Sequence, residues 1–197
     1  SPHLILASQS KTRAQLLDNA GLQFERIPAH IDEASVKESL LASHKPHVLA
    51  DALAELKALK ISRKYPSALV LGSDQILSCK DRLFDKATSL EELRDHLQFL
   101  SAKTHKLISA AVLAQGGRPV WRVQNEVVLQ MRSLTPEFIE EYILKEGDAL
   151  LSCVGGYRLE GLGAQLFETV EGDYFSVLGL PLLPLLKQLR HFGIVTS

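Results

Sequence analysis

The sequence has few cysteines and no long, uninterrupted apolar run. Cys79 and Cys153 are its only cysteines, too few for a disulfide framework and without the spacing of a metal site. We expect both to be buried thiols in a reducing cytoplasm. The apolar segment VLGLPLLPLLKQL at 177–189 is interrupted by two prolines and is too short to cross a bilayer.

A strong charge of either sign is lacking as well. The net charge of -1 at pH 7 argues against bulk binding to nucleic acid or to a membrane surface, so any anion site must be local. Repeats and low-complexity tracts are absent, and residues 4–7 are too few for the apolar part of a signal peptide. With 46% hydrophobic and 23% charged residues, we expect one soluble, cytoplasmic domain over residues 1–197.

What the sequence does contain is an alternation of strand and helix patterns, which predicts an α/β fold with a mixed sheet. The predicted strands lie at 4–7, at 24–28, at 68–72, in a hairpin that turns at 80–81, in a long pair around 116–117, and in a glycine-punctuated region at 155–179. The predicted helices lie at 11–20, at 35–41, from 46 on, from 90 on, from 136 on, and from 182 to the region of Gly193. We expect Leu49, Leu53 and Leu56 to form a buried stripe on the helix that begins at Pro46.

The segment LILASQSKTRAQLL at 4–17 passes directly from a strand into hydroxyl groups and cations. Ser8, Ser10 and Arg13 surround an expected helix N-terminus, whose free N–H groups and partial positive charge favour a phosphate group. Arg13, in the first turn, can reach back over such an anion. The alternative is that Ser8 or Ser10 only caps the helix and that Arg13 is a solvated surface residue.

Further charged residues lie close to other predicted strand ends. Glu33 is expected in a loop after a short strand, Asp74 at the end of the strand 68–72, and Lys86 just past the hairpin. Carboxylates can hold a divalent metal, and cations such as Lys57 can neutralise a triphosphate. We expect nearby cations to lower the pKa of Asp74 and to keep it ionised. Each residue also has an ordinary interpretation as a turn residue, a helix edge or a surface charge.

Taken together, these segments resemble the Maf family of nucleoside triphosphate pyrophosphatases. They follow the family's order over nearly the whole chain, and their combination is specific although no single segment is. The matching stretches are LILASQSKTRAQLL at 4–17, DE at 32–33, LKA at 56–58, GSDQ at 72–75, DK at 85–86, KTHKL at 103–107, and GGYRLEGLGAQLFETVEGDYFSVLGLPL at 155–182.

The resemblance implies a fold, a reaction and a set of site residues. The fold is an elongated mixed sheet with flanking helices and a cleft between two lobes, as in Maf and inosine triphosphatase proteins. The reaction is cleavage between the α- and β-phosphates by a homodimer with Mg²⁺ or Mn²⁺, which yields a nucleoside monophosphate and pyrophosphate. By residue match, Asp74 is catalytic and shares the metal with Glu33, and the substrate is held by Ser8, Ser10, Arg13, Glu33, Lys57 and Lys86.

Three positions bear on the base by the same resemblance: Thr12, Gln75 and Glu160. Gln75 and Glu160 are similar to the branch that favours 7-methyl-GTP, whereas the dTTP/UTP branch carries Thr and Gln there. A Glu carboxylate can accept hydrogen bonds from the N1–H and N2–H₂ edge of guanine. Thr12 departs from that branch, which has a Trp suited to a cationic methylated base, so a broader triphosphate specificity stays open.

Other functions remain open from the sequence alone. One is a nucleotide-binding regulatory protein, linked by family analogy to septum formation, without strong catalysis. Another is a phosphatase or nucleotidyltransferase that uses similar residues. His105, between Lys103 and Lys106, is interpreted either as a residue that orders the site or as a structural hydrogen-bonding group.

Overall fold

A computed structural model of the chain describes residues 2–40 and 45–197. Its strands are β1 (Leu4–Leu6), β2 (Glu25–Arg26), β3 (Leu69–Cys79), β4 (Arg82–Phe84), β5 (Thr104–Gln115), β6 (Arg118–Met131) and β7 (Phe167–Glu171). Its α-helices are α1 (Lys11–Asn19), α2 (Glu33–Leu40), α3 (Pro46–Lys64), α4 (Leu90–Leu100), α5 (Pro136–Glu146), α6 (Tyr174–Val177) and α7 (Leu182–His191). Three 3-10 helices follow α5: η2 (Gly147–Ser152), η3 (Val154–Gly156) and η4 (Leu162–Leu166).

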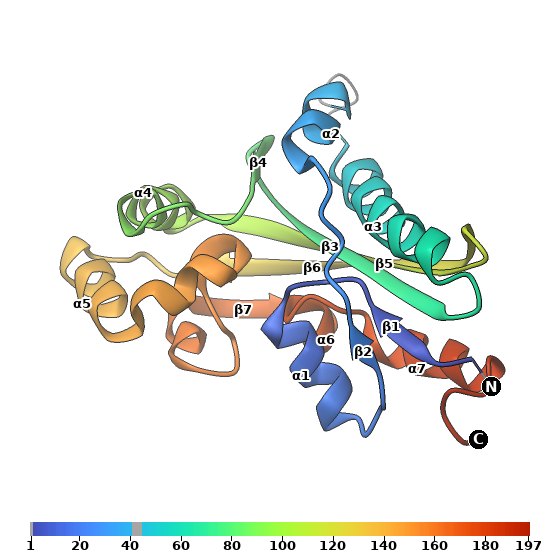
Figure 1. The fold of residues 1–197 in the computed structure, drawn as a ribbon. Coiled ribbons are helices and arrows are strands. Elements are labelled where there is room, and N and C mark those ends of the chain that lie inside the picture. Colours follow the sequence, from blue (N-terminus) through green and yellow to red (C-terminus); the bar gives the residue numbers. More distant parts are fainter. Residues whose placement is uncertain (1, 41–44) are drawn as a thin grey trace. The chain divides into compact units, whose positions relative to one another are not determined.

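The strands form one seven-stranded mixed sheet, which confirms the predicted α/β class (Figure 1). Its order is β2-β1-β3-β5-β6-β7, and β4 pairs with β3. Strand β1 is parallel to β2 and β3, whereas β4 is antiparallel to β3 and β7 is antiparallel to β6. None of the helices described in the structure is long and apolar enough for a membrane span.

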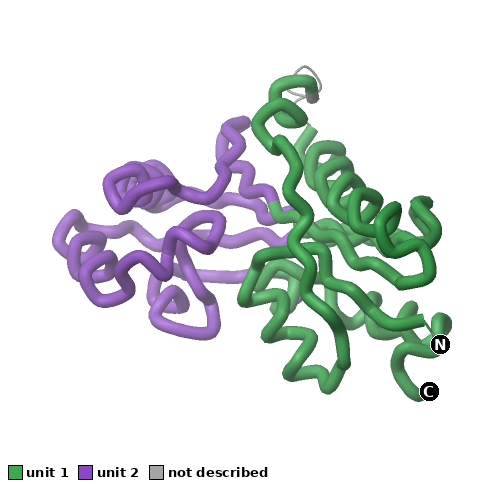
Figure 2. Tube along the Cα trace, in the orientation of Figure 1, with its two compact units in different colours: residues 1–75, 109–125, 174–197 green, residues 76–108, 126–173 purple. Residues whose placement is uncertain are grey.

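The chain divides into two compact units, which are coloured separately in Figure 2. Unit 1 contains residues 1–75, 109–125 and 174–197, and unit 2 contains residues 76–108 and 126–173. The long strands β3, β5 and β6 each contribute residues to both units. The expectation of one domain over residues 1–197 stays a prediction.

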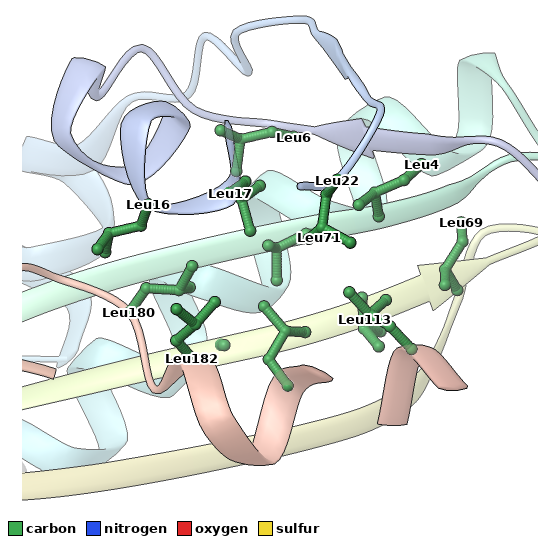
Figure 3. Close-up of a cluster of buried hydrophobic side chains, with 13 residues drawn as sticks. Leu4, Leu6, Leu16, Leu17, Leu22, Leu69, Leu71, Leu113, Leu180 and Leu182 are labelled. Atoms are coloured by element: carbon green, nitrogen blue, oxygen red, sulfur yellow. The ribbon is translucent and has the colours of Figure 1, made fainter. Parts of the chain in front are cut away.

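In unit 1, helices cover both faces of the sheet (Figure 1). Helix α3 lies on one face, and α1 and α7 lie on the other. Leucines of β1, α1, β3, β5 and α7 meet in a buried cluster on the second face (Figure 3). Labelled members of this cluster include Leu6, Leu17, Leu71, Leu113 and Leu182. Burying several leucine side chains, each worth about 1.5–3 kcal/mol, holds β1 and the start of α1 in place.

In unit 2, α4 packs against α5 and against η2 and η3, which follow α5. The contact with η3 is close, because a Cβ at Gly156 would lie 2.0 Å from the Leu93 Cδ1 of α4. Tyr142 on α5 is buried and donates a hydrogen bond to the carbonyl oxygen of Gly156 at 2.8 Å. The 3-10 turns are thus fixed to the two helices by packing and by a buried hydrogen bond.

Most predicted elements are confirmed, together with the chemistry that ends them. Ser89 caps α4 by accepting from Glu92 N, and Thr135 caps α5 in the same way. The hairpin between β3 and β4 turns at Lys80 and Asp81, which both have positive φ, as a two-residue turn requires. The predicted helix 35–41 corresponds to α2 up to Leu40, and residue 41 lies outside the described residues.

Two predictions of the fold are wrong. Leu56 is 37% exposed, and the buried residues of α3 include Ala54 and Ala58 instead, because small side chains let the helix approach the sheet. The region 155–179 is mostly helical turns, with β7 as its strand. Four of its six glycines, Gly155, Gly156, Gly172 and Gly179, have positive φ.

Candidate active site

The candidate site in unit 1 begins with a close contact between β3 and α3. A Cβ at Gly72 would lie 2.2 Å from the carbonyl oxygen of Ala54 and 2.7 Å from the backbone nitrogen of Ala58. Only glycine permits this approach of helix to strand. Lys57, one residue before Ala58, is thereby carried to Asp74, two residues after Gly72 on the same face of β3.

Lys57 joins the two candidate carboxylates. Its Nζ lies 2.9 Å from Glu33 Oε1 and 3.0 Å from Asp74 Oδ1, and it also contacts the carbonyl oxygen of Ser73 at 3.5 Å. Glu33 was expected in a loop but is the first residue of α2, because the Asp32 side chain accepts from Ser35 N and starts the helix there. The interpretation of Lys57 as a solvated helix edge is wrong, since its side chain is 12% exposed.

Asp74 lies within β3, beyond the last β3 residue that pairs with β1, Leu71, rather than at the end of a strand. Burial raises its pKa, although Lys57 and Arg13 act in the opposite direction. The expected lowering of this pKa is therefore wrong, because loss of hydration outweighs the nearby cations. Its Oδ1 is bound by Lys57, and its buried Oδ2 has no hydrogen-bond partner in the described structure.

The start of α1 combines capping with a buried cation. Ser10 Oγ accepts from Arg13 N at 3.2 Å and caps α1, which is the local role that was the alternative for this residue. Ser8 Oγ accepts from Ser10 N at 3.1 Å and so holds the turn before the helix. Arg13 is 8% exposed rather than solvated. Its Nε donates to the carbonyl oxygen of Gly179 at 2.8 Å, and within residues 2–40 and 45–197 no hydrogen bond is made by its Nη atoms.

Burial lowers the pKa of Arg13, and the carboxylates Asp74 and Glu33 raise it in turn. The same four side chains thus act on one another electrostatically, although Arg13 comes from α1 and the others from β3, α2 and α3. We refer to Arg13, Glu33, Lys57 and Asp74 as the charged centre. The structure brings these four predicted residues together.

The remaining predicted residues are divided between the units. Thr12 lies half-buried in the first turn of α1, and Gln75 follows Asp74 on β3; both belong to unit 1. Lys86, after β4, and Glu160, between η3 and η4, are exposed residues of unit 2. Lys86 is preceded by Asp85, whose Oδ1 accepts from Lys86 N. The roles of these four residues stay predictions.

Unit 2 contains a second buried polar group of different character. His105 Nε2 lies 2.8 Å from Tyr157 Oη, and burial lowers the pKa of His105 to about 4. Burial also raises the pKa of Tyr142 and of Tyr157. We refer to His105, Tyr142 and Tyr157 as the neutral centre. Its geometry matches the structural interpretation of His105.

The candidate carboxylates fit a divalent cation whose remaining ligands come from the substrate. Mg²⁺ and Mn²⁺ prefer oxygen ligands, and Mg²⁺ is often held by one or two carboxylates together with phosphate oxygens. Asp74 offers a buried oxygen without a partner, and Glu33 Oε2 lies 4.0 Å from Lys37 Nζ. Among the described residues there is no cluster of three or more His, Cys, Asp or Glu that could hold a metal.

Several supporting residues were missed from the sequence. Gly179, Ser109 and Ser176 contact Arg13 or Gln75 from positions far away in the chain, and no local pattern signals such contacts. Gly72 did carry a signal, because an isolated glycine within an apolar strand indicates close approach of another backbone. The cysteines are both free; Cys79 is buried as expected, and Cys153 is half-buried.

Comparison with known proteins agrees with the resemblance in the sequence. The family described as "Maf-like protein" matches residues 3–192, so the chain belongs to the Maf family. A 7-methyl-GTP pyrophosphatase of Rhizobium etli is 47% identical over 99% of this chain and 98% of its own length. A nucleoside triphosphate pyrophosphatase of Caulobacter vibrioides is 50% identical over 97% of this chain and 96% of its own. A HAM1 protein structure from Coxiella burnetii, at 14% identity over 66% of this chain and 73% of its own, has a TM-score of 0.41, too low to support a conclusion.

Proposed function

We propose that this chain hydrolyses a nucleoside triphosphate to the monophosphate and pyrophosphate. The observation that carries the proposal is the bridge from Glu33 through Lys57 to the buried Asp74, with Arg13 acting on the same carboxylates. Buried charges of this kind are costly and concentrate at functional sites. Two relatives that match this chain along nearly their whole length are named as triphosphate pyrophosphatases, and these names support the same reaction.

The phosphate chain is bound at the start of α1. Arg13 is buried, and its side chain makes a single hydrogen bond within the described structure, which leaves the Nη groups to face an anion. The N-terminus of α1 adds a partial positive charge and free N–H groups. Ser8 and Ser10 hold this turn in shape through their hydrogen bonds to backbone N–H groups. Lys86 adds a further cation to the phosphate chain, as the family resemblance implies.

Asp74 receives the proton in the hydrolytic step. The oxygen of a water molecule bonds to the α-phosphorus, the bond from this phosphorus to the bridging oxygen breaks, and pyrophosphate leaves with that oxygen. The water proton passes to Asp74 Oδ2, the carboxylate oxygen without a partner in the described structure. A carboxylate whose pKa is raised is a stronger base than an exposed aspartate. Lys57 keeps Asp74 oriented through Oδ1.

Glu33 would hold a divalent cation, Mg²⁺ or Mn²⁺, and Asp74 would share it through the water that it deprotonates. When bound, it neutralises phosphate charge and acidifies water in its coordination shell. Lys57 then balances the two carboxylates from the other side. Two carboxylates would leave most coordination positions to phosphate and water oxygens. Chelation is therefore expected to abolish turnover.

The preferred base is guanine-like, with 7-methyl-GTP as the candidate substrate. Glu160 is an exposed carboxylate that can accept from the N1–H and N2–H₂ edge of guanine. Gln75 supplies a further polar contact. Thr12 supplies no aromatic face for a cationic base, so we expect GTP itself to be hydrolysed as well. The names of two relatives from Rhizobium etli and Brucella abortus support this choice.

The assembly and location follow from the family resemblance alone. We infer a homodimer that acts in the cytoplasm on small triphosphates, with neither nucleic acid nor a membrane as partner. Light scattering of the purified protein tests the dimer: twice the mass of the 21.7 kDa chain is expected, and a single chain mass would contradict it.

The enzyme is favoured over a regulatory protein that binds nucleotides without catalysis, because relatives along nearly the whole chain are named as pyrophosphatases and because binding alone does not need the buried Asp74 with an unpartnered oxygen. The test is a panel of canonical and modified triphosphates, including 7-methyl-GTP, assayed with Mg²⁺ or Mn²⁺ and again with a chelator. We expect pyrophosphate and monophosphate in equal amounts. Binding without turnover would favour regulation, and free phosphate would indicate a phosphatase.

A further inference from the structure

The side-chain amide of Gln75 is held at its nitrogen end alone. Its Nε2 lies 3.0 Å from the carbonyl oxygens of both Ser176 and Val177 and 3.2 Å from Ser109 Oγ. Within the described part of the chain, no group donates to Gln75 Oε1. Because a backbone carbonyl can only accept, the two carbonyls require the amide nitrogen on their side. The orientation of Gln75 is therefore fixed by its neighbours.

The same short segment also holds Arg13. The carbonyl oxygen of Gly179 accepts from Arg13 Nε at 2.8 Å. Gly179 has a φ of +112°, and a Cβ there would lie 3.1 Å from Arg13 Nε, so a side chain would both strain the backbone and push the guanidinium away. Residues 176–179, the carbonyl segment, thus contact two predicted site residues through three backbone oxygens.

Buried polar contacts keep the carbonyl segment in place. Ser109 Oγ on β5 donates to the carbonyl oxygen of Ser176 at 2.6 Å, and Asn125 Nδ2 on β6 donates to Ser176 Oγ at 2.9 Å. Ser109 and Ser176 are both fully buried. A satisfied buried network of this kind is rigid, and loss of one member leaves another group without a partner.

Asp74 and Gln75 direct their side chains to opposite faces of β3, because successive strand residues alternate. Asp74 faces α3 and meets Lys57, whereas Gln75 faces the carbonyl segment. We propose that Ser109 and the carbonyl segment are positioning residues for substrate recognition. Ser109, Ser176 and Val177 turn Gln75 so that it offers Oε1, an acceptor, to an N–H or O–H donor of the nucleoside. Gly179 aims Arg13 at the phosphate chain.

This inference rests on the proposed function and predicts two separable effects. Ser109→Ala removes one contact to Gln75 and one to the carbonyl oxygen of Ser176, three residues before the Gly179 carbonyl that holds Arg13. We therefore expect about a two- to tenfold rise in KM for nucleoside triphosphates, the size of one hydrogen bond, with kcat unchanged. Inhibition by inorganic tripolyphosphate, which has no nucleoside, should stay the same. Gly179→Ala should weaken both triphosphate and tripolyphosphate binding, because it displaces Arg13.

Ser62→Ala is the matched control. Ser62 is also fully buried in unit 1, and its Oγ accepts one backbone hydrogen bond, from Gly117 N at 2.9 Å, away from Gln75 and Arg13. We expect both of its kinetic constants to match the wild type after thermal denaturation has shown all variants to be folded. The inference is overturned if Ser109→Ala behaves like Ser62→Ala, or if it weakens tripolyphosphate and nucleotide equally.

A spectroscopic measurement decides the positioning of Gln75 independently of turnover. In ¹⁵N-labelled protein, the Gln75 side-chain amide is assigned by its disappearance in Gln75→Leu. We expect its protons to exchange with water at least about tenfold more slowly than those of an exposed glutamine, and Ser109→Ala to remove much of this protection. An unprotected amide in the wild type would contradict the positioning. Absence of pyrophosphate release by the wild type would instead refute the proposed function.

Discussion

Two sets of polar side chains in this molecule compensate for the loss of hydration on burial in different ways. The charged centre of unit 1 consists of ionisable groups whose neighbours are one another, with Lys57 between Glu33 and Asp74. The neutral centre of unit 2 consists of a histidine and two tyrosines whose burial keeps them uncharged. Charges that stay buried in pairs are weak contributors to stability, whereas neutral hydrogen bonds stabilise modestly.

The two centres also differ in whether packing alone accounts for their buried polar side chains. A neutral network around His105 and Tyr157 is accounted for by packing and hydrogen bonding. Both centres keep polar atoms without partners in the described structure: His105 Nδ1 in the neutral centre, and Asp74 Oδ2 and the Arg13 Nη atoms in the charged centre. The difference lies in charge, because packing explains a buried neutral ring but not buried cations and carboxylates, which concentrate at functional sites. We therefore expect variants of the charged centre to lose activity and variants of the neutral centre to lose stability.

Apart from replacement of Asp74 itself, the largest effect is expected for Lys57→Met. Loss of this cation leaves Glu33 and Asp74 unbalanced, and we expect kcat/KM to fall about 10²–10³-fold. Because Lys57 lowers the pKa of Asp74, its removal should raise that pKa further. The acidic limb of the pH–rate profile, where activity appears as Asp74 ionises, should then move to higher pH. A limb that stays in place would separate Lys57 from Asp74.

The next effect concerns the pH dependence of stability in unit 2. The pKa of His105 is lowered from 6.5 to about 4. Below about pH 6.5 the His105 imidazole is therefore protonated in the unfolded chain but stays neutral in the folded chain. Stability should therefore fall as the pH drops from about 6.5 towards 4, by up to about 3 kcal/mol. His105→Gln should flatten this slope in urea titrations. The exposed His191→Gln should keep it, and an equal slope in both variants would argue against His105.

Gly72→Ala should join a loss of stability to a loss of activity. The added Cβ meets the backbone of α3, and overpacking of this kind costs about 1–3 kcal/mol. As α3 moves away from β3, Lys57 separates from Asp74, so activity should fall as well. Gly21→Ala is the control, because Gly21 has a φ of +82° but no atom within 4 Å of its Cβ position. It should lose some stability and keep its activity.

The smallest effect compares two helix caps with the same geometry. Ser10 Oγ accepts from Arg13 N in α1, and Ser89 Oγ accepts from Glu92 N in α4. Replacement of either by Ala should cost about 1 kcal/mol of folding free energy. Ser10→Ala should also raise KM for triphosphates, whereas Ser89→Ala should leave it unchanged. Equal KM values in the two variants would remove Ser10 from the phosphate site.

The sequence predicted those parts of the fold that local patterns determine. Capping residues such as Ser89 and Thr135, and the two-residue turn at Lys80 and Asp81, act through neighbours in the chain. The predicted apolar stripe of α3 is wrong at Leu56, because Gly72, distant in sequence, decides which face of the helix packs on the sheet. Tertiary contact outweighed helical periodicity there.

The residues of the candidate site could be predicted from the sequence, but their burial and their contacts with distant backbone could not. Arg13, Glu33, Lys57 and Asp74 were chosen by residue type and family resemblance, and the structure places them together. The sign of the pKa change at Asp74 was not predictable, because it depends on burial, which no local pattern reports. The carbonyl segment was missed for the same reason, since backbone carbonyls carry no signal in a sequence.

The central claim is that Asp74 performs chemistry rather than holding the fold. The most direct test is pyrophosphate release by Asp74→Asn. The control is Asp51→Asn, because Asp51 is a carboxylate on α3 that pairs with Arg122 instead of Lys57. We predict that Asp74→Asn folds with near wild-type thermal stability and releases pyrophosphate at least about 10³-fold more slowly, while Asp51→Asn keeps the wild-type rate. A folded Asp74→Asn variant that turns over triphosphates at the wild-type rate would contradict the account.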